Sequence, residues 1–120
     1  MEEMDDVPPT DQYIRGLRLV EKSLHPNHRA MLMAHYKAKG HTLTATELAE
    51  AAGYANWRGV NLQYGLFADR LAKAMNWQKP DDAQYSYAIA SFSKPTEREE
   101  DWLWHMHPQL VKAIEHLGWG

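Results

Sequence analysis

Apolar residues in the first third of the chain recur at helical spacing. They lie four, three and four residues apart, on one face of a helix, at Tyr13, Leu17, Val20 and Leu24. We therefore expect a first helix over about residues 11–24. Pro26 fixes its own φ and disfavours a helical residue before it, which should break the chain there. A second helix is expected over about residues 27–38 and should stop at Gly40.

The middle of the chain predicts a short helix, a tight turn and a longer helix. The segment from Thr42 to Thr46 offers a threonine N-cap, and Gly53 should close the short helix after barely two turns. The longer helix should begin near Trp57 and end near Asn76. Its apolar residues repeat at steps of four, three, four and four, at Val60, Tyr64, Phe67, Leu71 and Met75. This order is the layout of a helix-turn-helix motif.

After a polar break at residues 79–82, the chain predicts two strands and a last helix. Residues 84–92 are rich in aromatic side chains and lack helical periodicity, and residues 102–107 alternate in the way typical of a strand. The polar residues between them, 93–100, should form a long hairpin loop. Pro108 suits the first position of a closing helix.

Together these elements predict a mainly α fold. Its class is a winged-helix-like helix-turn-helix domain with a two-stranded β-hairpin wing and a C-terminal helix. A chain of 120 residues holds one ordinary domain. We expect residues 1–10 to form a flexible acidic N-terminus and residues 11–120 to form the single domain.

Composition narrows the class of protein. Apolar residues make up 44% of the chain, with five Trp and six Tyr, which is more burial potential than a disordered chain has. The absence of Cys excludes disulfides, thiol catalysis and thiolate metal sites. The sequence also lacks a run of 18 apolar residues and the features of a secretory signal. We therefore expect a cytoplasmic protein with no membrane partner.

The net charge of −3 hides an uneven distribution along the chain. Residues 1–13 contain five acids and no base, residues 14–80 contain ten bases and four acids, and residues 81–120 contain three bases and seven acids. A basic centre between acidic ends favours a face that attracts an anion such as nucleic acid. The alternative is that these cations are ordinary solvated side chains on helix surfaces.

The helix that begins at Trp57 is the candidate for reading DNA. Its first turns supply side chains suited to base edges, at Asn56, Arg58, Asn61 and Gln63. Asn and Gln bond adenine bidentately, and Arg bonds guanine in the same way. Phosphate contacts would then come from Arg70, Lys73 and Lys79. Two alternatives stay open: the fold serves protein contacts, or Asn56 is no more than the N-cap of its helix.

Two features oppose the DNA interpretation. The outer face of the same helix carries Leu62 and Leu66, and an apolar outer flank usually marks a protein partner. The predicted wing loop, residues 97–101, carries four acids and one base, which a phosphate backbone would repel. A second hypothesis is therefore a protein that binds its partner through the two leucines.

Metal binding and catalysis find little support. His28 and His35 lie seven residues apart on the second helix, and His105 and His107 lie two apart on a strand, so either pair could chelate zinc. The HExxH arrangement and His-carboxylate clusters are missing, which favours structural histidines. The sequence also lacks a nucleophile elbow and a phosphate-binding glycine loop. We expect no metal, no cofactor and no enzymatic activity.

Several stretches resemble a known bacterial domain. They are residues 11–17, 28–32 with 34–36, 44–54, 60–65, 102–104 with Met106 and Pro108, and 117–119. The similarity covers most of the chain from residue 11 to residue 119. The string Asn-Leu-Gln-Tyr-Gly at residues 61–65 is the most particular of them. The domain is found at the N-terminal side of HNH-type restriction endonucleases, including those that restrict modified cytosine.

The resemblance implies a DNA-recognition or accessory module that delivers a nuclease to its target. The sequence lacks a His-Asn-His nuclease half, so a stand-alone copy is not expected to cut. We therefore expect a non-catalytic module that binds double-stranded DNA, accessory or regulatory to a restriction or defence system. The alternative is a small phage or mobile-element inhibitor, of anti-CRISPR or anti-restriction type, that binds a nuclease, CRISPR or restriction complex. A homodimer is compatible with either hypothesis.

Overall fold

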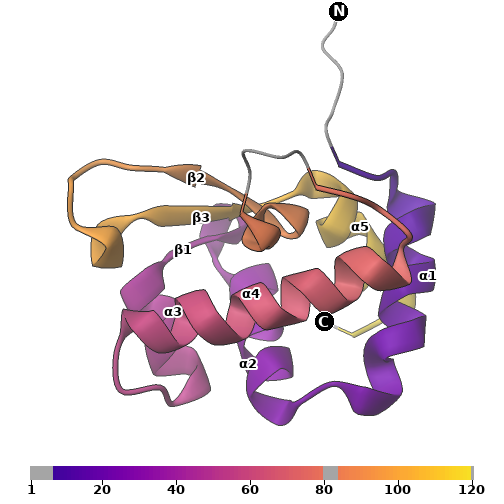
Figure 1. The fold of residues 1–120 in the computed structure, drawn as a ribbon, viewed down its shortest axis with the longest axis horizontal. Coiled ribbons are helices and arrows are strands. Elements are labelled where there is room, and N and C mark those ends of the chain that lie inside the picture. Colours follow the sequence, from indigo (N-terminus) through magenta and orange to yellow (C-terminus); the bar gives the residue numbers. More distant parts are fainter. Residues whose placement is uncertain (1–6, 80–83, 120) are drawn as a thin grey trace, which may run out of the picture.

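The computed structural model describes residues 7–79 and 84–119, and helices dominate it. The α-helices are α1 (Thr10–Val20), α2 (Pro26–Lys37), α3 (Ala45–Ala52), α4 (Trp57–Ala74) and α5 (Pro108–Leu117). The strands are β1 (Thr42–Thr44), β2 (Ala90–Ser93) and β3 (Leu103–Met106). Short 3-10 turns, η1 to η4, cover Glu21–Ser23, Lys39–His41, Tyr85–Ala88 and Glu99–Asp101. Helix α4 runs along the molecule, with the sheet near its first half and α1 crossing near its end (Figure 1).

The predicted order of short helix, turn and long helix is confirmed, and local hydrogen bonds explain its ends. The Thr44 hydroxyl accepts the Glu47 N–H at 3.0 Å, and the Glu47 carboxylate accepts the Thr44 N–H at 2.8 Å, which forms a capping box at the start of α3. Gly53 ends α3 in the left-handed region, with φ 80°. Asn56 then caps α4, because its side-chain oxygen accepts the Arg58 N–H at 2.9 Å.

The sheet has three strands among the described residues, whereas the sequence predicts a two-stranded hairpin. The order is β1-β3-β2, and both pairings are antiparallel. Strand β1 was missed because three residues in front of a helix cap are too few to show strand alternation. The His105 side chain links the three strands, since its Nδ1 pairs with Thr42 Oγ1 at 3.0 Å and its Nε2 with Ser93 Oγ at 2.6 Å.

The expectation of one strand over residues 84–92 is wrong for its first half. Residues 85–88 form the turn η3, and β2 begins at Ala90. The turn packs against α4, and Tyr13 of α1 donates its hydroxyl to the Ala88 carbonyl at 2.6 Å. The aromatic residues of this segment favour a strand. Its small side chains are buried, however, and allow close packing on α4, which outweighs the strand propensity.

The core lies where the helices α1 to α5 and the sheet meet. Its largest fully buried side chains include Tyr13, Leu17, Tyr64, Phe67, Leu71, Met75, Ile89, Leu110 and Ile114. Helices α1 and α4 approach closely at Gly16, where an added Cβ would lie 2.6 Å from Met75 Cγ and 3.0 Å from Leu71 Cδ1. A side chain at position 16 would therefore push the two helices apart.

Parts of two sequence predictions lie outside the described residues. They are the acids of the N-terminus at Glu2, Glu3, Asp5 and Asp6, and the polar break at Pro80, Asp81 and Asp82. Within the described part, Pro8 is buried, and Pro9 occupies the N-cap position of α1 without a side-chain hydrogen bond. Across residues 7–79 and 84–119, no helix has the length and apolar character needed to span a membrane.

Candidate nucleic-acid interface

Helix α4 has a buried face and a face open to solvent. Its solvent face carries Arg58 and Asn61 in the first turns and then Leu62 and Leu66, whose exposed fractions are 60% and 48%. Gly65 lies between them and leaves open space where a Cβ would be. The predicted outer face is therefore confirmed as a mixed surface, with polar groups near the helix start and apolar groups further along.

Asn56 and Gln63 differ from the other two predicted base-reading residues because local contacts use their side chains. The Asn56 oxygen holds the helix cap, as the alternative interpretation of this residue expected. Gln63 is half-buried and turned toward α2, where its Oε1 accepts a hydrogen bond from His28 Nε2 at 3.0 Å. Gln63 therefore does not share the open face of the helix with the other predicted base-reading side chains. Arg58 and Asn61 remain on the open face of the helix.

The three predicted phosphate contacts have partners within the protein. Arg70 is exposed and donates to the Ser23 hydroxyl in η1, the turn that follows α1. Lys73 forms an ion pair with Asp69 at 3.0 Å, and that hydrogen bond raises the pKa of its ammonium group. Lys79 lies 5.2 Å from the centre of the Tyr85 ring. Each cation would keep or exchange an intramolecular contact when it meets an anion.

Sequence reasoning missed a pocket of about 200 Å³ between α4 and the β2–β3 hairpin. Its lining residues are Asn61, Gln84, Tyr87, Phe92, Lys94, Glu99, Trp102 and Trp104. Phe92 and Trp104 meet edge to face, with ring centres 4.7 Å apart, and Lys94 lies 4.3 Å from the centre of the Trp102 ring. The one available signal was the density of aromatic residues in the two predicted strands.

Two wider hollows continue from this pocket along α4. One, of about 360 Å³, shares Asn61 and Gln84 with the pocket, and the next, of about 340 Å³, shares Lys79 and Tyr85 with its neighbour. The series reaches Trp77 beyond the end of the helix. The described residues thus form a groove along one flank of α4, with the aromatic pocket at the hairpin end.

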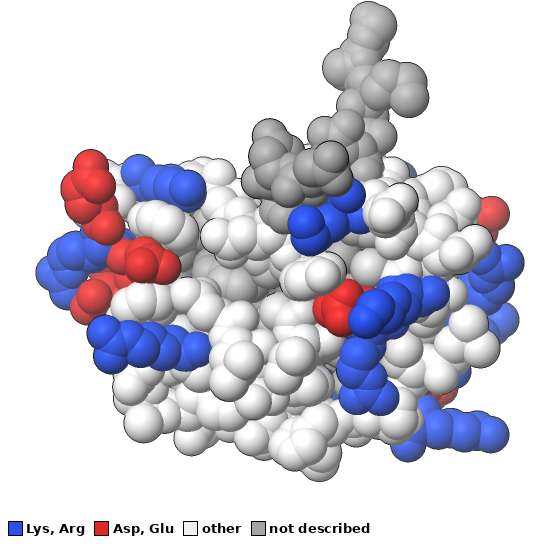
Figure 2. Space-filling model, in the orientation of Figure 1, with Lys and Arg blue, Asp and Glu red and all other residues white. Residues whose placement is uncertain are grey.

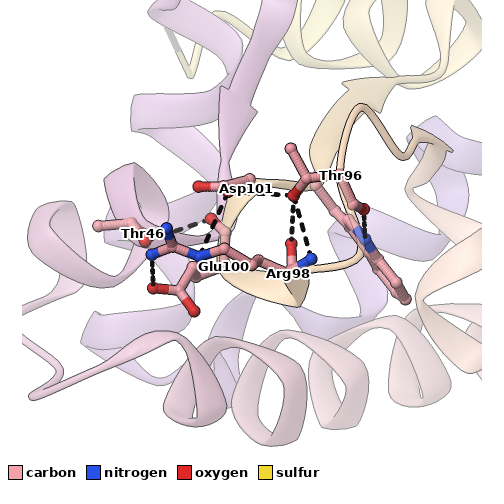
Figure 3. A network of polar contacts seen from close by, with 6 residues as sticks. Thr46, Thr96, Arg98, Glu100 and Asp101 are labelled. Atoms are coloured by element: carbon pink, nitrogen blue, oxygen red, sulfur yellow. Dashed lines mark hydrogen bonds and ion pairs between the residues drawn. The ribbon is translucent and has the colours of Figure 1, made fainter.

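The loop between β2 and β3 is held in place by a polar network (Figure 3). Arg98 pairs with Glu100 at 2.6 Å and with Asp101 at 3.6 Å, and its hydrogen bond to Glu100 raises the pKa of the guanidinium. Thr96 donates to the Asp101 carboxylate at 3.1 Å. Thr46 of α3 donates to the Glu100 carbonyl at 3.2 Å, which ties the loop to α3. The loop is therefore folded against α3.

Charge is distributed unevenly over this face of the molecule. At the hairpin end acidic side chains gather between basic ones, the surface over the middle of α4 is mostly uncharged, and the other basic side chains stand in separate groups (Figure 2). Arg98 offsets part of the negative charge of the loop, while Glu97 and Glu99 remain exposed. A phosphate backbone is therefore more favourably placed near the second half of α4 than near the loop.

The histidine prediction is confirmed at His35, which makes two structural hydrogen bonds. Its Nε2 donates to the Trp104 carbonyl at 2.9 Å, so the neutral ring accepts the Tyr64 hydroxyl at Nδ1, at 3.0 Å. Burial lowers the pKa of His35 to about 4. Within the described part of the chain, no three His, Asp or Glu side chains come together as metal ligands.

No protein-family model, curated protein or solved structure matches the chain. The open face of α4 and the groove beside it are therefore the basis on which a function is proposed.

Proposed function

We propose that the chain is a winged-helix-like module that binds double-stranded DNA. Helix α4 would enter the major groove, with the β2–β3 hairpin as the wing beside it. The observation that carries the proposal is the order of elements around α4. A capped short helix and a glycine turn precede it, the antiparallel hairpin flanks its first half, and its starting turns stay open to solvent.

Arg58 and Asn61 are the base-reading residues of this proposal, because they remain on the open face near the helix start. Arg70, Lys73 and Lys79 supply the phosphate contacts further along. Their present partners do not prevent this, since an exposed ion pair contributes about 0 to 1 kcal/mol and is exchanged at little cost. The acidic loop lies at the hairpin end, whereas Arg70 and Lys73 lie in the second half of α4.

The biological setting we propose is accessory or regulatory to a restriction or defence system, in the cytoplasm. The resemblance of the sequence to a domain of HNH-type restriction endonucleases supports it. In that setting the module selects the DNA and a separate nuclease cuts it.

Fluorescence anisotropy on labelled duplexes of about 20 to 30 base pairs, with and without cytosine methylation, tests the proposal at about 50 and 200 mM salt. We expect saturable binding that weakens steeply with salt. Arg58→Ala should cost about 1 to 3 kcal/mol of specific binding, and Lys73→Ala should reduce the salt slope by about one. Lys112→Ala, which removes an exposed cation on α5, is the matched control. Absence of binding at the lower salt would overturn the proposal.

The exposed leucines favour a second candidate function, a small inhibitor or adaptor that binds a protein or nucleoprotein complex. Leu62 and Leu66 lie one helical turn apart on the open face of α4. This candidate predicts a DNA-independent complex that survives about 0.5 M salt, where phosphate contacts are screened. Leu66→Glu should abolish that complex, whereas Leu19→Glu should not, because Leu19 is a comparably exposed leucine on α1. Equal effects of the two changes would count against the α4 leucines as the docking surface.

A further inference from the structure

The aromatic pocket between α4 and the hairpin carries an inference that rests on the proposed DNA binding and goes further. We propose that this pocket holds a single nucleobase that has left the base stack. Such a base comes from a single strand or is extruded from a duplex, and both sources present the same planar, hydrogen-bonding ring.

The walls of the pocket suit a flat ring. Trp104 is almost fully buried, stacks on the Tyr64 ring of α4 and meets the Phe92 ring edge to face, and both Trp104 and Phe92 line the pocket. Trp102 is half-buried at the side, and its indole N–H donates to the Thr96 carbonyl at 3.2 Å, which fixes the ring. Aromatic side chains that are held in place bind bases of any sequence, because every base has a π face.

The polar groups of the pocket match the edge of a base. Asn61 and Gln84 contribute amides, which both donate and accept, while Glu99 contributes a carboxylate that accepts. Base edges present such mixed donor and acceptor patterns. The volume of about 200 Å³ is below that of pockets for drug-sized ligands, and therefore fits one small ring system.

Lys94 favours a nucleobase over a cation, which is the other class of ligand that aromatic pockets bind. Rings around an acidic side chain also hold methylated ammonium groups. Here the Lys94 ammonium already lies against the Trp102 ring, so a second cation would be repelled. A neutral ring attached to a phosphate has the opposite character, since Lys94 can pair with that phosphate.

The pocket also lies where a base could reach it. Asn61 belongs to the open face of α4 and lines the pocket as well. A strand that passes along the open face of α4 would therefore lie next to the pocket.

The test compares the affinities of the whole chain for three probes of the same length, about 25 nucleotides per strand. The first probe is a fully paired duplex, and the third is the single strand. The second is a duplex whose central base lies opposite an abasic site, and it is made with each of the four bases at that position. We expect at least about tenfold tighter binding to the second probe than to the first, because the cost of unpairing is removed. Trp102→Leu should bring that ratio close to one while binding of the paired duplex is retained.

Trp119→Leu is the matched control, since Trp119 is another half-buried Trp and lies outside the pocket. If Trp102→Leu fails to fold by circular dichroism, Phe92→Leu serves for the same comparison. If the chain binds the single strand most tightly and the pocket variant loses that binding, the inference is supported and the source of the base is a single strand. Equal binding of the paired and unpaired-base probes overturns the pocket inference and leaves DNA binding intact. Absence of binding to every probe overturns both proposals.

Discussion

Leu71 and Leu66 lie five residues apart on α4, and their surroundings differ completely. Leu71 is fully buried and packs against Gly16 of α1, whereas Leu66 is 48% exposed on the opposite side of the helix. The buried face is occupied by side chains that the core requires. The open face carries apolar and polar groups that the core does not use, and these are the residues to which the proposed binding role is assigned.

The largest expected effect is on the buried face. Leu71→Ala should lower the free energy of unfolding by about 2 to 5 kcal/mol, because the lost methyl and methylene groups leave a cavity between α1 and α4. Urea denaturation followed by circular dichroism measures the change. Leu71→Met, which conserves volume, should cost less than about 1.5 kcal/mol. A loss below about 1 kcal/mol in Leu71→Ala would show that the two helices are not packed as described.

A second effect concerns the buried hydrogen bonds between His35, Tyr64 and Trp104. Burial lowers the pKa of His35 to about 4, below the value of about 6.5 expected in the unfolded chain. Its neutral form therefore stabilises the fold fully above pH 6.5, and that contribution is lost as the pH falls from about 6.5 to 4. The loss amounts to about 3 kcal/mol.

Urea denaturation of the wild type and of His35→Gln between pH 7.5 and 4.5 measures the contribution of His35. The wild type should lose stability more steeply than the variant, and the difference between the two curves isolates His35 from the other histidines and the carboxylates. Parallel curves would contradict a buried, neutral His35.

The smallest expected effect on stability is at Leu66, on the open face of α4. Leu66→Ala should change the free energy of unfolding by no more than about 0.5 kcal/mol, since its side chain lies largely in water. The measurement is the same urea denaturation as for Leu71→Ala. The two variants therefore carry the same substitution and differ only in the position of the leucine on α4. A loss above about 1 kcal/mol would mean that Leu66 is covered in the free protein.

The helices could be predicted from the sequence because their signals are local. The buried face of α4 repeats with helical period, and the threonine cap, Gly53 and Asn56 lie within one turn of the helix ends that they define. The sheet was less accessible, since β1 gains its partner from a strand about sixty residues later. Short strands have no periodicity of their own to be recognised by.

The candidate site was predicted in part, for a related reason. Arg58, Asn61 and the two leucines follow from the helical pattern of α4 and lie on its open face. The partner of Gln63 is His28, on another helix, which no spacing along the chain indicates. The aromatic pocket likewise gathers residues from α4, from the segment before β2 and from both sides of the hairpin loop. Such sites become visible when the tertiary fold is known.

The pairing of β1 with β3 has a consequence for how the chain folds. The side chains of Thr42 and His105 are hydrogen-bonded across a separation of 63 residues, and both α3 and α4 lie within the loop that this contact closes. Closing so long a loop costs entropy that is recovered when the sheet and core form together. The α3–α4 pair therefore depends on β3: without that strand, Thr44, the N-cap of α3, would lose its pairing with Leu103.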